Sequence, residues 1–462
     1  MRSIIVKNVT KNNLKGFCVK IPLQKLVGIV GPSGSGKSTL VHEVLYKSLI
    51  KNEWQIQNLP SKIEILEQKV VLPVNSKLSL GEFNFDKLKK KLAAIEKKDL
   101  LIVDEPCAGF CKKEREQIVK MLRQKVAAGY SIIAVEHNKE IIKDADYIIE
   151  LGPGAGRYGG KLIFAGTNAQ FKKSQTITVK HVFETKRKKY VQKEYKKSKA
   201  ITISKINAGC FKNYTFSFPL NDIVCLTGCS GAGKSTLLDV AYRALYKGKN
   251  AWKIRLKSVK VAGKTNVRRS FFVPQSPIGE HPSSTLATYT QVWDNIRTIF
   301  SNQKLSKKLK LTKADFIISK KILEGAGSFL KDVLKVFFQD KNINDVMHLT
   351  IDEALETFKT DSLIVRKLKF LQEVGLGYLT LGQKSNSLSG GEAQRVRVAK
   401  ILSKKLGDRS VYIFDTPSRG LHLKDIPVLV NVFRKIVDKN NTILIADNRE
   451  ELFDYCDYKI DL

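Results

Sequence analysis

Two glycine-rich stretches, "GIVGPSGSGKSTLVH" (Gly28–His42) and "LTGCSGAGKSTLLDV" (Leu226–Val240), decide the fold of this chain. Each carries the pattern G-x-x-x-x-G-K-S between an apolar, β-like run and a run compatible with a helix. In this pattern the glycines let backbone N–H groups surround a phosphate, the lysine reaches the β- and γ-phosphates, and the serine can ligate Mg²⁺. The sequence therefore predicts two phosphate-binding loops, each between a strand and a helix of an α/β domain.

The segments that flank the two loops also repeat, which indicates an internal duplication. Upstream, "IIVKNVTKNNLKGFCVKIP" (Ile4–Pro22) resembles "ITISKINAGCFKNYTFSFP" (Ile201–Pro219). Downstream, "LLIVDEPCAGF" (Leu100–Phe110) matches "VYIFDTPSRGL" (Val411–Leu421), and from there the residue numbers of the two halves differ by a constant 311. We therefore expect two α/β domains of the same topology.

The halves differ in length between the phosphate loop and the acidic residue at a later strand end. Lys37 and Asp104 are 67 positions apart, whereas Lys234 and Asp415 are 181 apart, so the second half holds 114 more residues. Apolar residues recur there at three- and four-residue steps, and Thr350 precedes acidic residues as a helix cap does, so we expect mostly helices. The predicted division is a first domain at 1–180, a basic linker at 181–200, and a second domain at 201–462 with a helical insertion at about 241–387.

The chain has 462 residues and a formal net charge of +37, which favours a polyanionic partner such as nucleic acid. A lysine-rich surface without a ligand and an anionic membrane surface are the alternatives. No apolar run approaches the ~18 residues of a membrane span, and the N-terminal run is a poor signal peptide, so we expect a cytoplasmic protein. The seven cysteines are odd in number and form no C-x-x-C pair, which argues against zinc, and in a cytosolic chain we expect no disulfides.

Longer motifs connect the chain with a known family. The run "SLSGGEAQRVRVAKIL" (Ser387–Leu402) resembles the signature motif of the ATP-binding cassette (ABC) proteins. Three stretches resemble UvrA, the damage-recognition ATPase of bacterial nucleotide excision repair: "FFVPQSPIGEHPSSTLATYTQVWDNIR" (Phe271–Arg297), "VGLGYLTLGQKSNSLSGGEAQRVRVAK" (Val374–Lys400) and "ADYIIELGPGAGRYGGKLIFAGT" (Ala145–Thr167). The resemblance covers most of the chain. It implies two P-loop ABC ATPase cassettes in tandem, with ATP and Mg²⁺ as cofactors and DNA as a partner.

The chain departs from UvrA in two respects. UvrA-type proteins carry zinc modules with C-x-x-C pairs, and this sequence has none, so no zinc is expected. Only 41 positions separate Lys37 from Leu78, which leaves no room for the large UvrA insertion that serves UvrB and DNA. The resemblance is thus to a shortened form for which a UvrB-type partner is in doubt and a homodimer stays open.

In the ABC family each ATP lies between the phosphate loop of one cassette and the signature of the other. For site one, the resemblance implies Gln68, Glu105 and His137 as catalytic residues, with Glu105 as the general base for the attacking water. Ser38 and Asp104 would hold Mg²⁺. The ATP-binding residues would be Gly31, Ser33, Gly34, Gly36, Lys37, Ser38 and Thr39, with Ser389, Gly390, Gly391 and Glu392 of the opposite signature.

Site two has the residues expected to bind ATP but lacks the general base and the histidine expected for hydrolysis. Its ATP-binding residues would be Gly228, Ser230, Gly231, Gly233, Lys234, Ser235, Thr236 and Gln275, with Ser235 and Asp415 for Mg²⁺. Thr416 stands at the position of the base, Asn448 at that of the histidine, and Leu80 at a glycine of the signature. A threonine cannot act as a base near neutral pH, so we expect hydrolysis at site one and little turnover at site two. The alternative is that Asp447 or another acid replaces the base.

Taken together, these features favour a DNA-associated ATPase without sequence preference, since no base-reading motif is visible. A cassette ATPase for drug resistance or a membrane partner is the alternative, and a nucleotide-gated scaffold with negligible turnover is a third. Candidate phosphate contacts are the segments Val267–Arg269, Lys304–Lys313 and Phe85–Lys98 and the linker run "KRKKYVQKEYKKSK" (Lys186–Lys199). For the linker run, the alternative is a solvated linker without a ligand.

Overall fold

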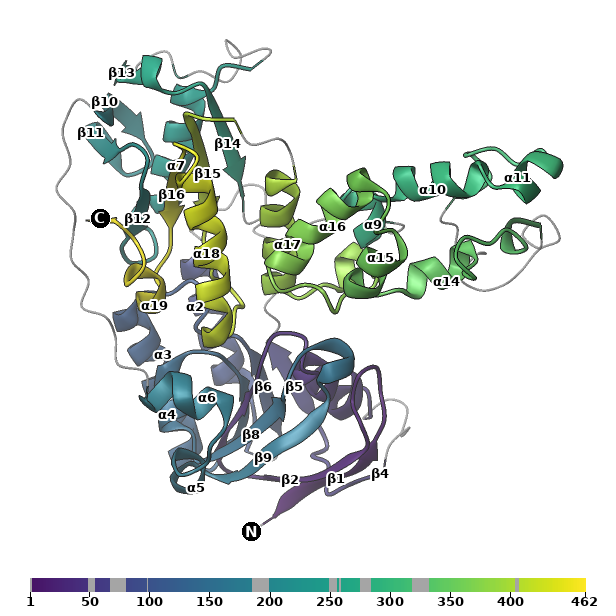
Figure 1. Ribbon diagram of the computed structural model, residues 1–462. Helices are drawn as coiled ribbons and strands as arrows, with labels where there is room; N and C mark the ends of the chain where they lie inside the picture. Colours follow the sequence, from purple (N-terminus) through teal and green to yellow (C-terminus); the bar gives the residue numbers. More distant parts are fainter. Residues whose placement is uncertain are drawn as a thin grey trace. The chain divides into compact units, whose positions relative to one another are not determined.

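The computed structural model of the chain describes residues 2–48, 55–66, 80–97, 99–184, 199–248, 256, 259–274, 284–317, 332–403 and 407–462. They belong to two compact units (Figure 1). The larger unit comprises Met1–Pro274 and Gly407–Leu462, and the smaller unit comprises Gln275–Leu406. Both phosphate loops therefore lie in the larger unit, and the signature run lies in the smaller one.

The first half of the larger unit is built on two sheets. Its strands are β1 (Ser3–Val9), β2 (Phe17–Pro22), β3 (Leu26–Val30), β4 (Gln55–Gln57), β5 (Ile63–Leu66), β6 (Leu100–Asp104), β7 (Ser131–Val135), β8 (Tyr147–Gly152) and β9 (Lys161–Thr167). Six form a sheet in the order β5-β6-β7-β3-β8-β9, parallel except for the last pair, and three form an antiparallel sheet, β2-β1-β4. Every residue of β3 and β7 is buried, as expected for central parallel strands covered on both faces.

The second half repeats this arrangement. Its strands are β10 (Ala200–Ala208), β11 (Phe211–Pro219), β12 (Ile223–Thr227), β13 (Lys260–Ala262), β14 (Arg269–Val273), β15 (Ser410–Asp415), β16 (Thr442–Ala446) and β17 (Tyr458–Asp461). They form a parallel sheet, β14-β15-β16-β12-β17, and an antiparallel sheet, β11-β10-β13. The register repeats too, because Leu26 pairs with Ile132 in the first half and Ile223 with Ile443 in the second. The predicted tandem α/β fold is confirmed.

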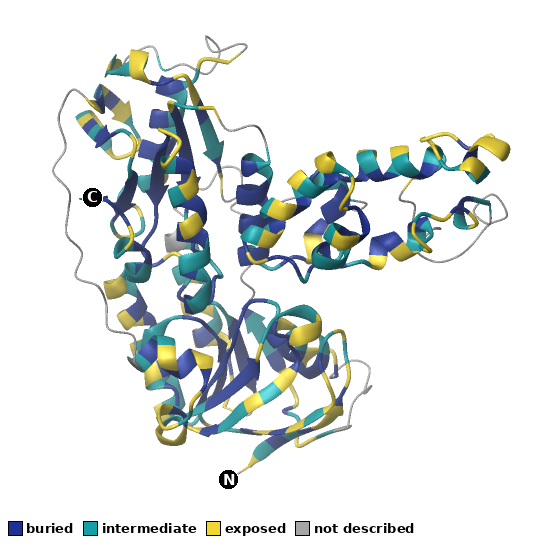
Figure 2. Cartoon of the chain, in the orientation of Figure 1, coloured by how far each residue is buried: buried dark blue, intermediate teal, exposed yellow. Residues whose placement is uncertain are grey.

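Helices cover the large sheets of this unit (Figure 2). They are η1 (Thr39–Tyr46), α2 (Leu80–Ala94), α3 (Lys112–Ala127), α4 (Lys139–Asp144), η2 (Gly156–Tyr158), α5 (Asn168–Lys172), α6 (Ile177–Val179), η3 (Lys180–Glu184), α7 (Lys234–Leu245), η5 (Lys264–Asn266), η7 (Leu423–Asp425), α18 (Ile426–Val437) and α19 (Glu450–Phe453). In α18 a proline in the first turn starts the helix, and Leu429, Val430 and Phe433 bury its apolar face. The element after each phosphate loop, η1 or α7, buries leucines and valines in the core of its own half.

The smaller unit is mainly helical among its described residues. Its helices are α9 (Leu286–Tyr289), α10 (Trp293–Ser301), α11 (Lys304–Lys308), α14 (Ile343–His348), α15 (Ile351–Thr357), α16 (Ser362–Glu373), η6 (Ser385–Ser387) and α17 (Gly390–Leu402). Thr350 caps α15 as predicted, because its backbone N–H donates to Glu353 Oε2 at 2.8 Å and its Oγ1 accepts from the Glu353 N–H at 3.2 Å. Of the predicted insertion at 241–387, β13 and β14 are strands of the larger unit, and helices of the smaller unit begin at Leu286.

Candidate nucleotide-binding sites

The first phosphate loop connects β3 with η1 in a conformation that requires glycine. Gly31 has φ 132° and Gly36 has φ 103°, both in the region that L side chains rarely adopt. A Cβ on Gly31 would lie 2.0 Å from the carbonyl oxygen of Leu151, so no side chain fits there. The buried Lys37 ammonium donates to the carbonyls of Gly31 at 2.9 Å and Pro32 at 2.8 Å. The loop is thus a preformed backbone cradle with a lysine nitrogen at its first glycine.

The second phosphate loop has the same backbone form between β12 and α7. Gly228 has φ 146° and Gly233 has φ 89°. The Lys234 ammonium donates to the carbonyls of Gly228 at 2.6 Å and Cys229 at 2.9 Å, the same pair of positions that Lys37 contacts in the first loop. Burial lowers the pKa of Lys234. Judged by the loops alone, the two sites are equivalent.

The remaining loop residues take positions that follow from the glycine turns. Gly34, at φ 74°, and Gly231, at φ 83°, occupy equivalent left-handed positions. Ser33 Oγ donates to the carbonyl of Gly420, which belongs to the second half, at 3.1 Å. Ser38 precedes η1, whose first residue Thr39 accepts from Asn12 Nδ2 at 3.4 Å. In the second loop Ser235 and Thr236 lie in the first turn of α7.

The acidic residues at the strand ends follow β6 and β15. Asp104 is the last residue of β6, and its Oδ2 lies 3.1 Å from His42 Nε2 of η1. Asp415 is the buried last residue of β15, and it pairs with Ala446 in the neighbouring strand. In each half, therefore, one strand lies between the strand that ends in the acid and the strand that leads into the phosphate loop: β7 lies between β6 and β3, and β16 lies between β15 and β12. This position suits a water-mediated Mg²⁺ ligand in a P-loop site.

Glu105 and Thr416 occupy the same backbone position in the two halves. Both have φ 50°, and their N–H groups donate to the carbonyls of Val135 at 2.8 Å and Ala446 at 2.7 Å respectively. The Thr416 hydroxyl donates to the carboxylate of Asp415 at 3.1 Å. The backbone of the second half thus keeps the form that aims Glu105, and only the side chain has changed.

The surroundings of Glu105 oppose its ionisation. Burial raises the pKa of Glu105 to about 8, and the charges of Asp104 and Glu136 act in the same direction. Arg419, from the second half, and Lys37 act in the opposite direction. A raised carboxyl pKa is a common property of catalytic acids and bases.

Two further acids, Glu136 and Asp447, hold the loops that follow the central strands. Glu136 accepts from the backbone N–H groups of Cys107 at 3.0 Å and of His137 at 2.8 Å. Asp447, 311 positions later, accepts from the backbone N–H of Ser418 at 3.0 Å and from the Ser418 hydroxyl at 2.8 Å. It also accepts from the backbone N–H groups of Asn448 at 2.8 Å and Arg449 at 3.0 Å. Asp447 is therefore the counterpart of Glu136, and this geometry supports a structural role over a substitute base.

His137 and Asn448 follow these acids and differ in their contacts. The imidazole of His137 lies edge-on to that of His422, with ring centroids 5.5 Å apart. The Asn448 amide donates to the carbonyl of Gly109 at 2.8 Å, and its backbone carbonyl accepts from Arg115 Nη1 at 3.2 Å. Burial lowers the pKa of His422 well below its ordinary value. The first half thus presents an imidazole where the second presents an amide bound to the opposite half.

One cavity joins the two sets of strand-end loops. Glu105 and His137 line it from the first half, and Thr416, Arg419 and Asn448 line it from the second. Sequence analysis missed Arg419, which lies at the position of Ala108 in the first half. Its charge acts on Glu105 across the junction of the halves, and only the packing of the halves could have revealed this.

Some predicted site residues cannot be placed in either site. Gln68 and Gln275 lie outside the described residues, and so does the side chain of Leu80. The signature residues lie in the smaller unit, where Ser389 caps α17: its Oγ accepts from the N–H of Glu392 at 3.3 Å. Gly390 and Gly391 form the first turn of this helix.

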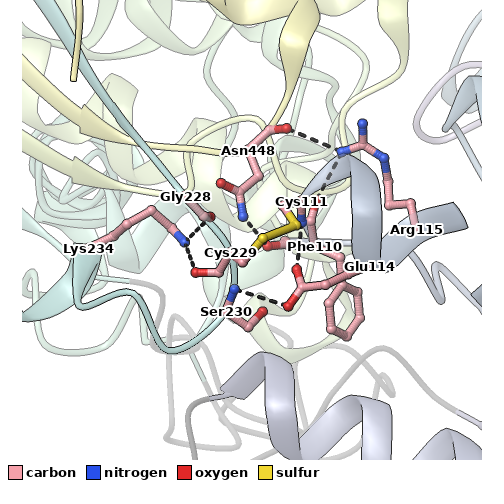
Figure 3. The surroundings of a disulfide bond; sticks show 10 residues. Phe110, Cys111, Glu114, Arg115, Gly228, Cys229, Ser230, Lys234 and Asn448 are labelled. Atoms are coloured by element: carbon pink, nitrogen blue, oxygen red, sulfur yellow. Dashed lines mark hydrogen bonds between the residues drawn. A yellow bond between two sulfur atoms is a disulfide. The ribbon is translucent and has the colours of Figure 1, made fainter. Parts of the chain in front are cut away.

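Cys111 and Cys229 form a disulfide, contrary to the expectation from sequence (Figure 3). Their Cα atoms are 5.0 Å apart, within the ordinary range for such a bond, although 118 positions separate them in the chain. The expectation was wrong because it rested on the expected compartment, whereas the packing of the two halves brings these two residues together. Together with Glu114 they also place three ligand-type atoms within 4.8 Å of one another.

Comparisons with known proteins agree with these features. The pattern of the family described as ABC transporter matches residues 211–419. UvrABC system protein A of Clostridium perfringens is 34% identical over 79% of this chain and 42% of its own length, and that of Aquifex aeolicus is 32% identical over 92% and 49%. The chain spans about half the length of these curated relatives.

Solved structures show the same fold. The crystal structure of UvrA2 from Deinococcus radiodurans matches with a TM-score of 0.84 at 19% identity, over 99% of this chain and 95% of that one. A ribosome-bound archaeal Pelota and ABCE1 structure matches with a TM-score of 0.54 at 15% identity, over 98% of this chain and 74% of that one. Among the described residues, every helix is too short or too polar to cross a bilayer.

Proposed function

The chain is a UvrA-like protein with tandem ATP-binding cassettes, and we propose that it is a Mg²⁺-dependent ATPase with one hydrolytic and one degenerate nucleotide site. One observation carries the proposal. The two phosphate loops and the strand ends beside them share their backbone conformation. At the equivalent strand-end position, however, site one has Glu105 and site two has Thr416. We further propose the domain boundaries 1–180, 181–200 and 201–462 for this arrangement.

The first loop suits a nucleotide phosphate, because it is a backbone cradle that a Cβ on Gly31 would fill. Lys37 would leave the carbonyls of Gly31 and Pro32 to meet the phosphates. Ser38 and Asp104 would hold Mg²⁺, which neutralises developing charge on the phosphates.

In its ionised form Glu105 would orient and deprotonate the attacking water, and His137 would contact the terminal phosphate. The signature residues Ser389 to Glu392 would complete site one. In site two, Lys234, Ser235 and Asp415 would retain ATP, and Thr416 cannot take a proton from water near neutral pH. Each role follows the matched positions of the family, and site geometry supports the asymmetry between the two halves.

We propose DNA as the partner, bound without sequence preference, in the cytoplasm. The net charge of +37 and the resemblance to UvrA support this. In the smaller unit, Lys304, Lys307, Lys308, Lys310 and Lys313 are all exposed, which supports the segment Lys304–Lys313 as a phosphate contact. A UvrB-type partner stays a question for binding experiments, because the sequence lacks the corresponding insertion.

Steady-state ATP hydrolysis with and without duplex DNA tests the function directly. We expect Mg²⁺-dependent turnover that DNA changes, and fluorescence anisotropy should show binding that weakens steeply with salt. Replacing Lys307 and Lys308 by glutamate should weaken binding and reduce the salt slope by about two. The matched control replaces the exposed Lys7 and Lys20 of the larger unit by glutamate. DNA binding no tighter than millimolar at low salt, or equal loss in both variants, would refute the proposed contact.

A further inference from the structure

The Cys111–Cys229 disulfide lies in site two (Figure 3). Cys229 is the second residue of the phosphate loop, directly after Gly228, and it is an exposed residue. Cys111 immediately precedes α3 of the first half. The bond therefore ties the nucleotide cradle of one half to a helix start of the other. A conformational change that separates the two halves at this site would have to break it or be blocked by it.

The same helix start places a carboxylate on the phosphate loop. Glu114 Oε1 accepts from the backbone N–H of Ser230 at 3.0 Å, and Glu114 Oε2 accepts from the backbone N–H of Cys111 at 2.7 Å. Backbone N–H groups of this loop are the groups that bind phosphate oxygens. The carboxylate of Glu114 thus occupies a donor that ATP would need, and the disulfide three residues earlier holds it there.

One more contact, apart from the lysine, distinguishes this site. The Lys234 ammonium binds the carbonyls of Gly228 and Cys229 as Lys37 binds those of Gly31 and Pro32, so the lysine is engaged alike in both sites. The Asn448 amide donates to the carbonyl of Gly109, two residues before Cys111. The phosphate loop and Asn448, which stands at the position of His137, are therefore both engaged by groups of the first half around the cross-link.

Site one lacks this device. The residues equivalent to Cys229 and Cys111 are Pro32 and His422, which cannot form a disulfide. The first loop contacts the second half through Ser33 Oγ and the carbonyl of Gly420, a neutral hydrogen bond without a carboxylate. The cross-link therefore contacts the phosphate loop of site two and not that of site one.

We propose that the Cys111–Cys229 disulfide is a redox lock that closes the second nucleotide site, with Glu114 as the internal anion in place of phosphate. The inference rests on the proposed function in one point, the binding of ATP by site two. A dithiol reductant opens the lock: one thiolate attacks a sulfur of the disulfide to give a mixed disulfide, and the second thiol resolves it. The protein gains two electrons and two protons as two thiols, and the reductant leaves as a disulfide. Exposure of Cys229 gives the reductant access.

The cross-link itself is tested on the full chain purified without reductant. Peptide mapping under non-reducing conditions should give a linked peptide pair containing Cys111 and Cys229 that tris(carboxyethyl)phosphine separates. Metal analysis of the same sample should give no stoichiometric zinc. Separate peptides with two free thiols, or about one zinc per chain held by Cys111, Glu114 and Cys229, would each overturn the lock.

Nucleotide stoichiometry then tests what the lock does. Equilibrium dialysis with ATP and Mg²⁺ should give about one nucleotide per chain in oxidised protein and about two in reduced protein, because Glu114 and its cross-link close only site two. Cys111→Ser should bind about two in both states, since serine is a preferred N-cap and keeps the start of α3. The matched control, Cys18→Ser, removes an exposed free cysteine and should behave as the unmodified chain.

Two further variants separate the possible failures. In a Lys37→Ala background the remaining ATP binding reports on site two. Replacing Glu114 by glutamine in that background should tighten ATP binding about tenfold in the oxidised state, because it removes the negative charge that contacts the Ser230 N–H. Two nucleotides per chain in both redox states would overturn the lock and leave the proposed function standing. One nucleotide per chain in reduced protein and in Cys111→Ser would overturn the proposed second site, and the lock with it.

Discussion

Replacing Glu105 by glutamine tests whether one site carries out the hydrolysis. Glutamine has nearly the same shape, and the N–H of residue 105 still donates to Val135, so the strand end should keep its form. What disappears is the group that can accept a proton from water. General-base catalysis contributes about 10²- to 10⁴-fold, so we expect turnover to fall by at least about a hundredfold, which is about 2.7 kcal/mol in the barrier.

The size of the loss depends on what site two can supply. Thr416 has the same φ of 50° and the same backbone hydrogen bond, so its hydroxyl stands where a base would stand. That hydroxyl donates to Asp415 and accepts no proton near neutral pH. Asp447 holds Ser418 and the following backbone N–H groups, and it is the counterpart of Glu136. Residual turnover from site two should therefore be negligible beside the loss at site one.

Phosphate release at saturating ATP and Mg²⁺, in the presence of reductant, measures the effect. The matched control is Glu116→Gln, the same chemical change at an exposed position of α3, which should leave turnover unchanged. Equilibrium dialysis should show that Glu105→Gln still binds ATP, so that the loss is one of chemistry. Retention of more than about half of the turnover would refute the assignment, and Asp447→Asn in the same chain would then test the substitute acid.

Three further results are expected. Gly31→Ala should abolish nucleotide binding at site one in a dialysis assay, because its Cβ would meet a carbonyl oxygen at 2.0 Å, whereas Gly109→Ala, with φ 84° and open space around the Cβ, should cost only about 1–2 kcal/mol of stability. Asp447→Ala should lower the free energy of unfolding in urea by about 3 kcal/mol or more, since three buried backbone N–H groups lose their acceptor. Lys139→Ala should lower it by at most about 1 kcal/mol, because the ion pair with Glu451, 3.0 Å long, is partly exposed; a larger loss would contradict that estimate.

The duplication could be predicted from sequence because it leaves a linear record. An offset of 197 positions relates the two phosphate loops and an offset of 311 relates the later strands, so the sequence indicates which strands correspond, and the pairings of Leu26 with Ile132 and of Ile223 with Ile443 show the same correspondence in space. The phosphate loops were predictable for a related reason. Their function needs glycine at positions of positive φ, so the residue type reports the backbone conformation.

Contacts between the halves leave no such record. Cys111 and Cys229 are ordinary by spacing, and Arg419 is one of many basic residues in the chain. Their positions depend on how the end of β6 meets the opposite phosphate loop, and how the end of β15 meets Glu105. The role of Asp447 was open for the same reason, because hydrogen bonds to Ser418, and not the residue type, support a structural carboxylate.

The inequality of the two sites has two independent physical sources. On the proposed assignment, Thr416 in place of a base would affect the chemical step, while the contact of Glu114 with Ser230 would affect access of phosphate to the cradle. Neither change explains the other. A site without a base could still leave its phosphate loop free for ATP, and a site whose phosphate loop is blocked could still have a base. A site that only holds ATP can act on its partner site solely through occupancy. Control of that occupancy by the Cys111–Cys229 bond is therefore the form of regulation that a non-hydrolysing site can use.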